Sequence, residues 1–257
     1  MQRLTYGSYL RVPELLALQE PLSSPPHHDE LLFITIHQVY ELWFKQLLHE
    51  LAAVLKSLNA DRLLRTAKEF SSIHTIQRLL EAQVDILETM TPQEFNEFRD
   101  HLRPASGFQS LQFREIEFLC GLKGTDALKH LETSAEERSR LERRLDEPTL
   151  SDAVYGLLKR RGFAVETHDE RVSSLKQIYE EPDKYYDLYL LLEDLIEFDE
   201  RFLLWRSRHI LMVERMIGSK MGTGGSLGVA YLATTLNRKF FPELWEVRTY
   251  LGKGQYG

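Results

Sequence analysis

Apolar residues recur at helical spacing through FITIHQVYELWFKQLLHEL, residues 33–51. Residues three or four positions apart share one face of an α-helix. Here that face carries Phe33, Tyr40, Phe44, Leu47 and Leu51. The opposite face is polar and carries Gln38, Glu41, Lys45 and His49. The pattern predicts a long helix from about Asp29 to Asn59, and it places one titratable ring, His37, within the apolar face.

Similar patterns predict helices along most of the chain. By residue number, the predicted helices are 61–90, 91–104, 111–122 and 182–218. Thr91-Pro92 has the residue types of a helix start, and Gly218 those of a helix end. The charged stretch 132–161 is interpreted as a solvated helical face. Strand signals, internal repeats and flexible linkers are scarce, so we expect one all-α domain over residues 1–257, opened by a polar, proline-containing segment 1–28.

Composition narrows the class of protein. The chain has 257 residues and a formal net charge of −7, which argues against a nucleic-acid-binding groove lined by excess Lys and Arg. The single cysteine, Cys120, cannot form an internal disulfide, which favours a reducing compartment. Neither a signal peptide nor a membrane-spanning run of apolar residues is evident. These features predict a soluble, cytoplasmic protein with no membrane or nucleic-acid partner.

Two histidines, His37 and His209, lie on the apolar faces of separate predicted long helices. A single histidine in such a position is more often a hydrogen-bonded core residue than a ligand. Two of them favour a shared cavity in which one imidazole could bind a haem iron. The competing metal sites lack their motifs, because neither Glu-x-x-His pairs for di-iron nor cysteine pairs for zinc are present.

Two further features are candidates for substrate binding. The glycine-rich stretch GTGGSLG, residues 222–228, lacks the Lys-Ser/Thr of a phosphate-binding loop. It is either a surface turn or a mobile loop that closes on a ligand through Thr223. Arg99 follows two aromatic residues, Phe95 and Phe98. It could form a surface salt bridge, or it could bind a substrate carboxylate with its planar guanidinium.

Four segments together resemble the bacterial tryptophan 2,3-dioxygenase family. They are LTYGSYL, PPHHDELLFITIHQVYELWFKQLLHEL, FNEFRDHLRPASGFQSLQFREIEF and LWRSRHILMVERMIGSKMGTGGSLGV. The resemblance covers most of the chain, but it is weak over residues 125–183. It implies an all-helical homotetramer that encloses haem b, with ferrous iron in the active form. Such an enzyme uses O2 to cleave the indole C2–C3 bond of L-tryptophan, giving N-formyl-L-kynurenine.

The resemblance also implies roles for individual residues. His209 corresponds to the axial ligand of the haem iron, and His37 to the distal, catalytic histidine that meets the indole N–H. Arg99 corresponds to the residue that binds the substrate carboxylate, helped by Thr223. The remaining residues that it implies for substrate binding are Phe33, Ile34, Thr35, Ile36, Phe95, Ser106 and, from a neighbouring subunit, Tyr6. Some members of the family have tyrosine at the position of Phe95.

Two alternatives stay open from the sequence. One is a related haem oxygenase that acts on a substituted tryptophan or indole, since one small substituent changes binding by only about 1–3 kcal/mol. The other is a helical binding protein that has kept the fold without the chemistry. The presence of His209, Arg99 and the glycine-rich stretch favours an enzyme with an amino-acid substrate.

Overall fold

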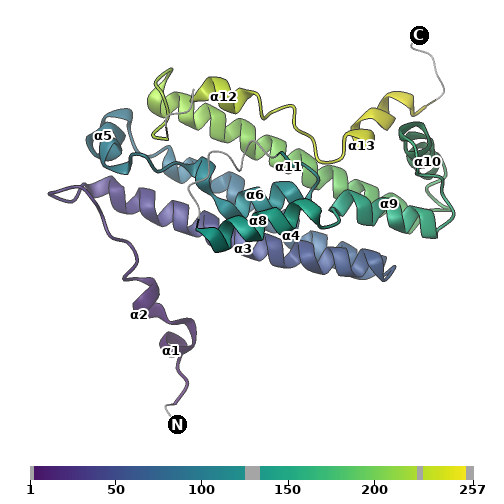
Figure 1. Cartoon of the computed structure of the whole chain (residues 1–257), viewed down its shortest axis with the longest axis horizontal. Helices are drawn as coiled ribbons and strands as arrows, with labels where there is room; N and C mark the ends of the chain where they lie inside the picture. The colour runs from purple at the N-terminus through teal and green to yellow at the C-terminus, as the bar shows by residue number, and fades with distance from the viewer. Residues whose placement is uncertain (1–2, 125–133, 225–227, 253–257) are drawn as a thin grey trace.

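Three long helices form the body of the molecule (Figure 1): α3 (His28–Asn59), α4 (Leu63–Leu87) and α11 (Tyr186–Ile217). The computed structural model describes residues 3–124, 134–224 and 228–252, and these contain helices and no strands. Helix α4 packs against both α3 and α11. Their buried apolar side chains belong to one continuous cluster. The predicted all-α fold is confirmed.

Local contacts explain where α3 begins. Nδ1 of His27 accepts a hydrogen bond from the Asp29 amide and caps the helix. One turn on, the buried Glu30 accepts hydrogen bonds from the amides of Leu22 and Ser23. Burial opposes ionisation of Glu30, but a hydrogen bond from the Ser23 hydroxyl, together with those from the two amides, outweighs it and lowers the pKa of Glu30. The carboxylate therefore fixes the chain that leads into α3 against the start of the helix.

Shorter elements close the end of the body where the first residues of α3 lie. They are α5 (Pro92–Phe98) and the 3-10 helices η1 (Arg99–Leu102) and η2 (Gly107–Gln109). Helix α6 (Leu111–Leu119) follows and packs against α3. Helix α5 begins at a capping box made by Thr91 and Glu94, as its sequence predicts. The tighter turn of η1 follows at once and carries Arg99 inward, where its side chain is buried.

The charged part of the chain forms α8 (Ala135–Asp146), α9 (Leu150–Arg160) and α10 (His168–Glu180). Leu141 is the one buried residue of α8, so most of this helix faces solvent as predicted. Two arginines of α8 also contact the body of the molecule. Arg140 and Arg144 both form ion pairs with Glu115, which is buried in α6. The prediction of a merely solvated face is therefore too simple, because α8 also neutralises a buried carboxylate.

The C-terminal part runs back along α11 as α12 (Val229–Ala233), α13 (Pro242–Glu246) and the 3-10 helix η3 (Val247–Tyr250). A fully buried carboxylate on α11, Asp199, holds it in place. Asp199 accepts hydrogen bonds from the amides of Phe240 and Phe241 and from the indole N–H of Trp245. Loss of this carboxylate would leave three buried donors unpaired.

The N-terminal segment leads away from the body as two short helices (Figure 1), α1 (Tyr6–Leu10) and α2 (Val12–Leu15). Its apolar side chains are exposed, and Tyr6 is 80% accessible. The expectation that residues 1–28 contact a neighbouring subunit stays a prediction. In the described part of the chain, no helix is both long and apolar enough to cross a membrane.

Candidate functional site

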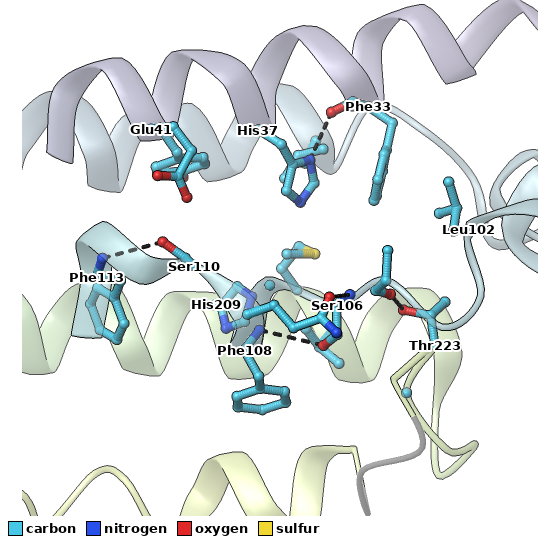
Figure 2. A pocket seen from close by; sticks show the side chains of 18 of the residues that line it. Phe33, His37, Glu41, Leu102, Ser106, Phe108, Ser110, Phe113, His209 and Thr223 are labelled. Carbon is cyan, nitrogen blue, oxygen red and sulfur yellow. Dashed lines mark hydrogen bonds between the residues drawn. The ribbon is translucent and has the colours of Figure 1, made fainter. Parts of the chain in front are cut away.

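A cavity of about 830 Å³ lies between α3 and α11 and continues to α5, η2 and α6. This volume is typical of a site for a small molecule or cofactor. Aromatic and aliphatic side chains make up most of its wall. Figure 2 shows the side chains of α3 entering from one side and those of α11 and the η2 region from the other. The two histidines that the sequence singles out, His37 and His209, both line this cavity.

His37 projects from α3 with a defined hydrogen bond. Its Nδ1 lies 2.7 Å from the carbonyl oxygen of Phe33, one turn earlier in the helix. A carbonyl can only accept, so Nδ1 carries the proton. Burial lowers the pKa of His37 and favours the neutral ring, although the Phe33 carbonyl and Glu41 oppose this shift. Neutral His37 therefore presents Nε2 to the cavity as a hydrogen-bond acceptor.

His209 faces the same cavity from α11. Burial lowers its pKa to about 4, helped by the nearby His37. Its ring is therefore neutral at physiological pH. The indole of Trp205, one turn earlier, stacks on it with 5.8 Å between ring centroids and 19° between ring planes. No hydrogen bond to the His209 ring is present among the described residues, so a ring nitrogen is available to a ligand.

An aromatic group closes the end of the cavity near Arg99. The ring of Phe33 lies 4.1 Å from that of His37 and 5.7 Å from that of Phe95, centroid to centroid. Arg99 is 6% exposed and donates from one terminal nitrogen to the carbonyl of Met221. Its Nε is buried without a partner in the described chain. A buried arginine with an unpaired N–H is a candidate for binding an anion.

The glycine-rich stretch reaches the same end of the cavity. The hydroxyl of Thr223 donates to the carbonyl of Ala105 at 2.7 Å, and both residues line the cavity beside Ser106 (Figure 2). The fold thus brings residues 104–106 and 221–224, which are far apart in sequence, into contact. Residues 225–227 of the predicted loop lie outside the described residues.

The structure brings seven of the predicted residues to one cavity: Phe33, His37, Phe95, Arg99, Ser106, His209 and Thr223. It does not bring Ile34, Thr35 or Ile36 there. Successive residues of a helix point in different directions, so Ile36 is in the core and Thr35 is exposed. Of the stretch 33–37, Phe33 and His37 line this cavity, and the predicted roles of all five residues in substrate binding stay predictions. Tyr6 is also absent from this wall, but its predicted role concerns another subunit.

Sequence reasoning missed a polar part of the wall. Glu117 forms ion pairs with Arg114 and with Arg206, and all three residues line the cavity. Arg206 lies one turn before His209 in α11 and also donates to the carbonyl of Arg238 at 2.7 Å. Arg114 and Glu117 lie three residues apart, so they share one face of a helix. Two opposite charges on an otherwise apolar face are the sequence signal that could have revealed this group.

The site suits a haem by the chemistry of its donors. Among the described residues, no three His, Cys, Asp or Glu side chains come together as they would around a metal ion. A haem needs only one protein ligand because its porphyrin supplies four nitrogens. His209 is neutral and lies on an apolar wall, which are the requirements for such a ligand.

Fold and site together define a class of protein: an all-helical protein with one histidine on each side of a largely apolar internal cavity. The chain belongs to the tryptophan 2,3-dioxygenase family, whose model matches residues 1–161 and 150–251. It is 50% identical over 254 residues to the tryptophan 2,3-dioxygenase of Nocardioides sp.. The aligned residues cover 97% of this chain and 95% of that protein.

Other members of the family are similar over almost their whole length. The tryptophan 2,3-dioxygenase of Herpetosiphon aurantiacus is 48% identical, and the alignment covers 97% of this chain and 99% of that protein. The tryptophan 2,3-dioxygenase of Serratia proteamaculans is 42% identical, and the alignment covers 98% of this chain and 94% of that protein. These matches do not favour either alternative, the haem oxygenase with another indole substrate or the non-catalytic binding protein.

Proposed function

We propose that this chain is a haem-dependent dioxygenase that cleaves the indole C2–C3 bond of L-tryptophan with O2, giving N-formyl-L-kynurenine. The observation that carries the proposal is the hydrogen bond between Nδ1 of His37 and the Phe33 carbonyl. This hydrogen bond occupies Nδ1–H and leaves Nε2 as an acceptor inside an apolar cavity. An indole N–H is a donor without acceptor capacity, so it complements this nitrogen.

The proposed cofactor is haem b, held by His209. The low pKa of His209 keeps its nitrogen lone pair free of a proton, and the stacked Trp205 restrains the plane of the ring. When bound, the haem supplies the ferrous iron at which O2 is activated. The contribution of the chain is to hold that group and to place the substrate beside it.

The polar end of the substrate fits the end of the cavity near Arg99. There the unpaired Nε of Arg99 is buried, and a carboxylate would satisfy it with a charge-assisted hydrogen bond. Thr223 lies at the same end and offers a hydroxyl. Two groups that fix the amino-acid end would orient the indole carbons toward the oxygen, which is catalysis by proximity.

The aromatic end of the substrate fits beside Phe33 and His37. Phe33 offers the face or edge of its ring to an indole. Nε2 of His37 then accepts a hydrogen bond from the indole N–H, which sets the orientation of the indole ring. We assign His37 this orienting role rather than that of an essential base, because an indole N–H is a very weak acid.

The proposal also includes the assembly and the location that the family resemblance implies. We infer a cytoplasmic homotetramer in which Tyr6 contacts the site of a neighbouring subunit. The support within this chain is limited to the exposed apolar side chains of α1 and α2, which lead away from the body.

Labelled oxygen tests the reaction directly. Haem-loaded protein is incubated with L-tryptophan under ¹⁸O2, and the products are analysed by mass spectrometry. The proposal predicts N-formylkynurenine with both new oxygen atoms labelled. Product with one labelled atom, or haem-loaded protein that binds L-tryptophan without forming product, would contradict a dioxygenase.

A further inference from the structure

The backbone at Gly224 lies close to Ser106. A β-carbon built on Gly224 would lie 2.6 Å from Cβ of Ser106 and 3.1 Å from its Oγ. Side-chain carbons do not tolerate such a distance, and Cβ of Ser106 cannot move away without its backbone. A hydrogen atom in place of a side chain is therefore what allows residue 224 to contact Ser106.

This contact is one of three that seat residues 221–224 on the rest of the site. The carbonyl of Met221 accepts from the buried Arg99. The hydroxyl of Thr223 donates to the carbonyl of Ala105 at 2.7 Å. Gly224 then touches Ser106. Because all three contacts are made by four consecutive residues, displacement of one end of this segment moves the other contacts as well.

The base of the segment is also tightly closed. Gly228 has a φ of +58°, and a β-carbon there would lie 2.8 Å from the carbonyl oxygen of Lys220. Residues 220 and 228 are therefore in close contact. Residues 220–224 are therefore held at Lys220 by its contact with Gly228, and at Gly224 by its contact with Ser106.

We propose that Gly224 is a positioning residue for substrate binding. Its lack of a side chain lets residues 221–224 seat against Ala105 and Ser106, which holds the Arg99 guanidinium and the Thr223 hydroxyl where the amino-acid end of the substrate binds. The inference rests on the proposed function for the identity of that substrate. Gly224 itself touches no reacting atom.

The requirement for glycine at this position is steric. Gly224 does not have the positive φ that favours glycine, unlike Gly218 and Gly228. Alanine at this position would therefore avoid the strain of a left-handed backbone conformation. The substitution Gly224→Ala thus tests the close contact, because it introduces one methyl group at a position without a left-handed φ.

The test measures equilibrium binding to the haem-loaded protein, followed by the change in haem absorbance. Gly224→Ala should weaken L-tryptophan binding about tenfold or more, as expected for overpacking by a methyl group. Binding of tryptamine, which keeps the amino group but lacks the carboxylate that Arg99 binds, should weaken less than binding of L-tryptophan. In turnover, KM for L-tryptophan should rise more than kcat falls. Equal affinity of wild type and Gly224→Ala for L-tryptophan would overturn the proposal.

Gly156→Ala is the matched control. Gly156 lies in α9, outside the cavity, and a β-carbon there would meet only the end of the Arg160 side chain at 3.5 Å, an ordinary contact. This variant should bind L-tryptophan as wild type does. If it lost affinity as Gly224→Ala does, the effect would be a general one of glycine replacement and the proposal would be wrong.

Rescue by a second substitution separates the contact from general damage. Ser106→Gly removes the two side-chain atoms that lie closest to the new methyl group, and the next nearest atom is the Pro104 carbonyl oxygen at 3.5 Å. The cost of Gly224→Ala, measured in the Ser106→Gly background, should therefore fall to about threefold or less. If Gly224→Ala also lowers the melting temperature, the same rescue should appear in melting. An undiminished cost in the Ser106→Gly background would contradict the steric explanation.

Failure of the proposed function and failure of the role of Gly224 give different results. If wild-type protein loads haem but neither binds nor oxidises L-tryptophan, the proposed function fails. If wild type does both and Gly224→Ala binds L-tryptophan equally well, only the role of Gly224 fails.

Discussion

Nδ1 of His37 lies 2.7 Å from the carbonyl oxygen of Phe33, and the two rings lie 4.1 Å apart, centroid to centroid. Helical spacing creates this relationship, because residues four apart are neighbours on one face of α3. The hydrogen bond decides which ring nitrogen of His37 carries the proton. As a result, one turn of helix provides both an aromatic surface and an oriented acceptor in the cavity.

Replacing His37 by alanine tests the orienting role. The variant should keep its haem and lose about ten- to a hundredfold in kcat/KM for L-tryptophan, because one hydrogen bond and the orientation it gives are lost. The loss should be smaller for 1-methyltryptophan, which has no indole N–H to donate. A haem-loaded variant with no turnover at all would instead make His37 an essential base.

Replacing His209 by alanine removes the proposed iron ligand. The purified variant should contain little haem and should not oxidise L-tryptophan, because no other described side chain on that wall of the cavity offers an imidazole. Added imidazole should restore part of the haem absorbance by filling the space that the side chain leaves. Full haem content and activity without imidazole would rule out this ligand.

Replacing Arg99 by lysine keeps the charge and removes the planar fork. We expect KM for L-tryptophan to rise about tenfold or more and kcat to fall less, because binding of the carboxylate is weakened. Tryptamine, which has no carboxylate, is the matched ligand, and its affinity should be nearly unchanged. A similar loss for both ligands would show that Arg99 acts on the structure of the cavity and not on the carboxylate.

The pKa of His209 predicts how the stability of the haem-free protein depends on pH. Burial lowers this pKa from 6.5 to about 4. At pH values below 6.5 the unfolded chain therefore binds a proton that the folded chain does not. The free energy of unfolding should fall as the pH decreases from 6.5 to 4, by about 3 kcal/mol at most from this residue.

The variant His209→Gln provides the reference for that measurement, because glutamine does not titrate. Urea unfolding of both haem-free proteins across this pH range gives the difference directly. The stability of wild type should decrease more steeply on acidification than that of His209→Gln. Parallel curves would contradict a neutral, buried His209.

Much of the helical framework could be predicted from the sequence. The apolar stripe and acidic start of α3 predict a helix over residues 29–59, and the helix found is His28–Asn59. The capping box at Thr91 likewise marks the start of α5. These features are local, since spacing and capping depend on residues within one or two turns.

The polar wall of the cavity could not be predicted in the same way. Whether Arg206 meets solvent or Glu117 depends on how α6 packs beside α11, and no local pattern encodes that. The same holds for Glu115, whose burial is compensated by Arg140 and Arg144 of α8. Charged residues on helices usually face water, so each of these pairs looks like a solvated charge in the sequence.

The roles of the substrate-binding residues stay predictions, and the structure gives the positions of their side chains. The family resemblance implied a continuous stretch from Phe33 to His37, whereas helical geometry brings only its first and last residues to the cavity. The role of Gly224, by contrast, is not evident from the sequence. Its contact with Ser106 joins two loops that are more than a hundred residues apart, and a glycine in a glycine-rich stretch does not reveal which partner requires it.

The most direct test of the account is an absorption spectrum of the purified, reduced, haem-loaded protein, recorded before and after L-tryptophan is added in air. The account predicts an intense haem band that depends on His209, followed by growth of the N-formylkynurenine absorbance. Absence of a haem band after reconstitution with hemin would contradict the assignment of the cavity. A haem band without product would contradict the assignment of L-tryptophan as the substrate.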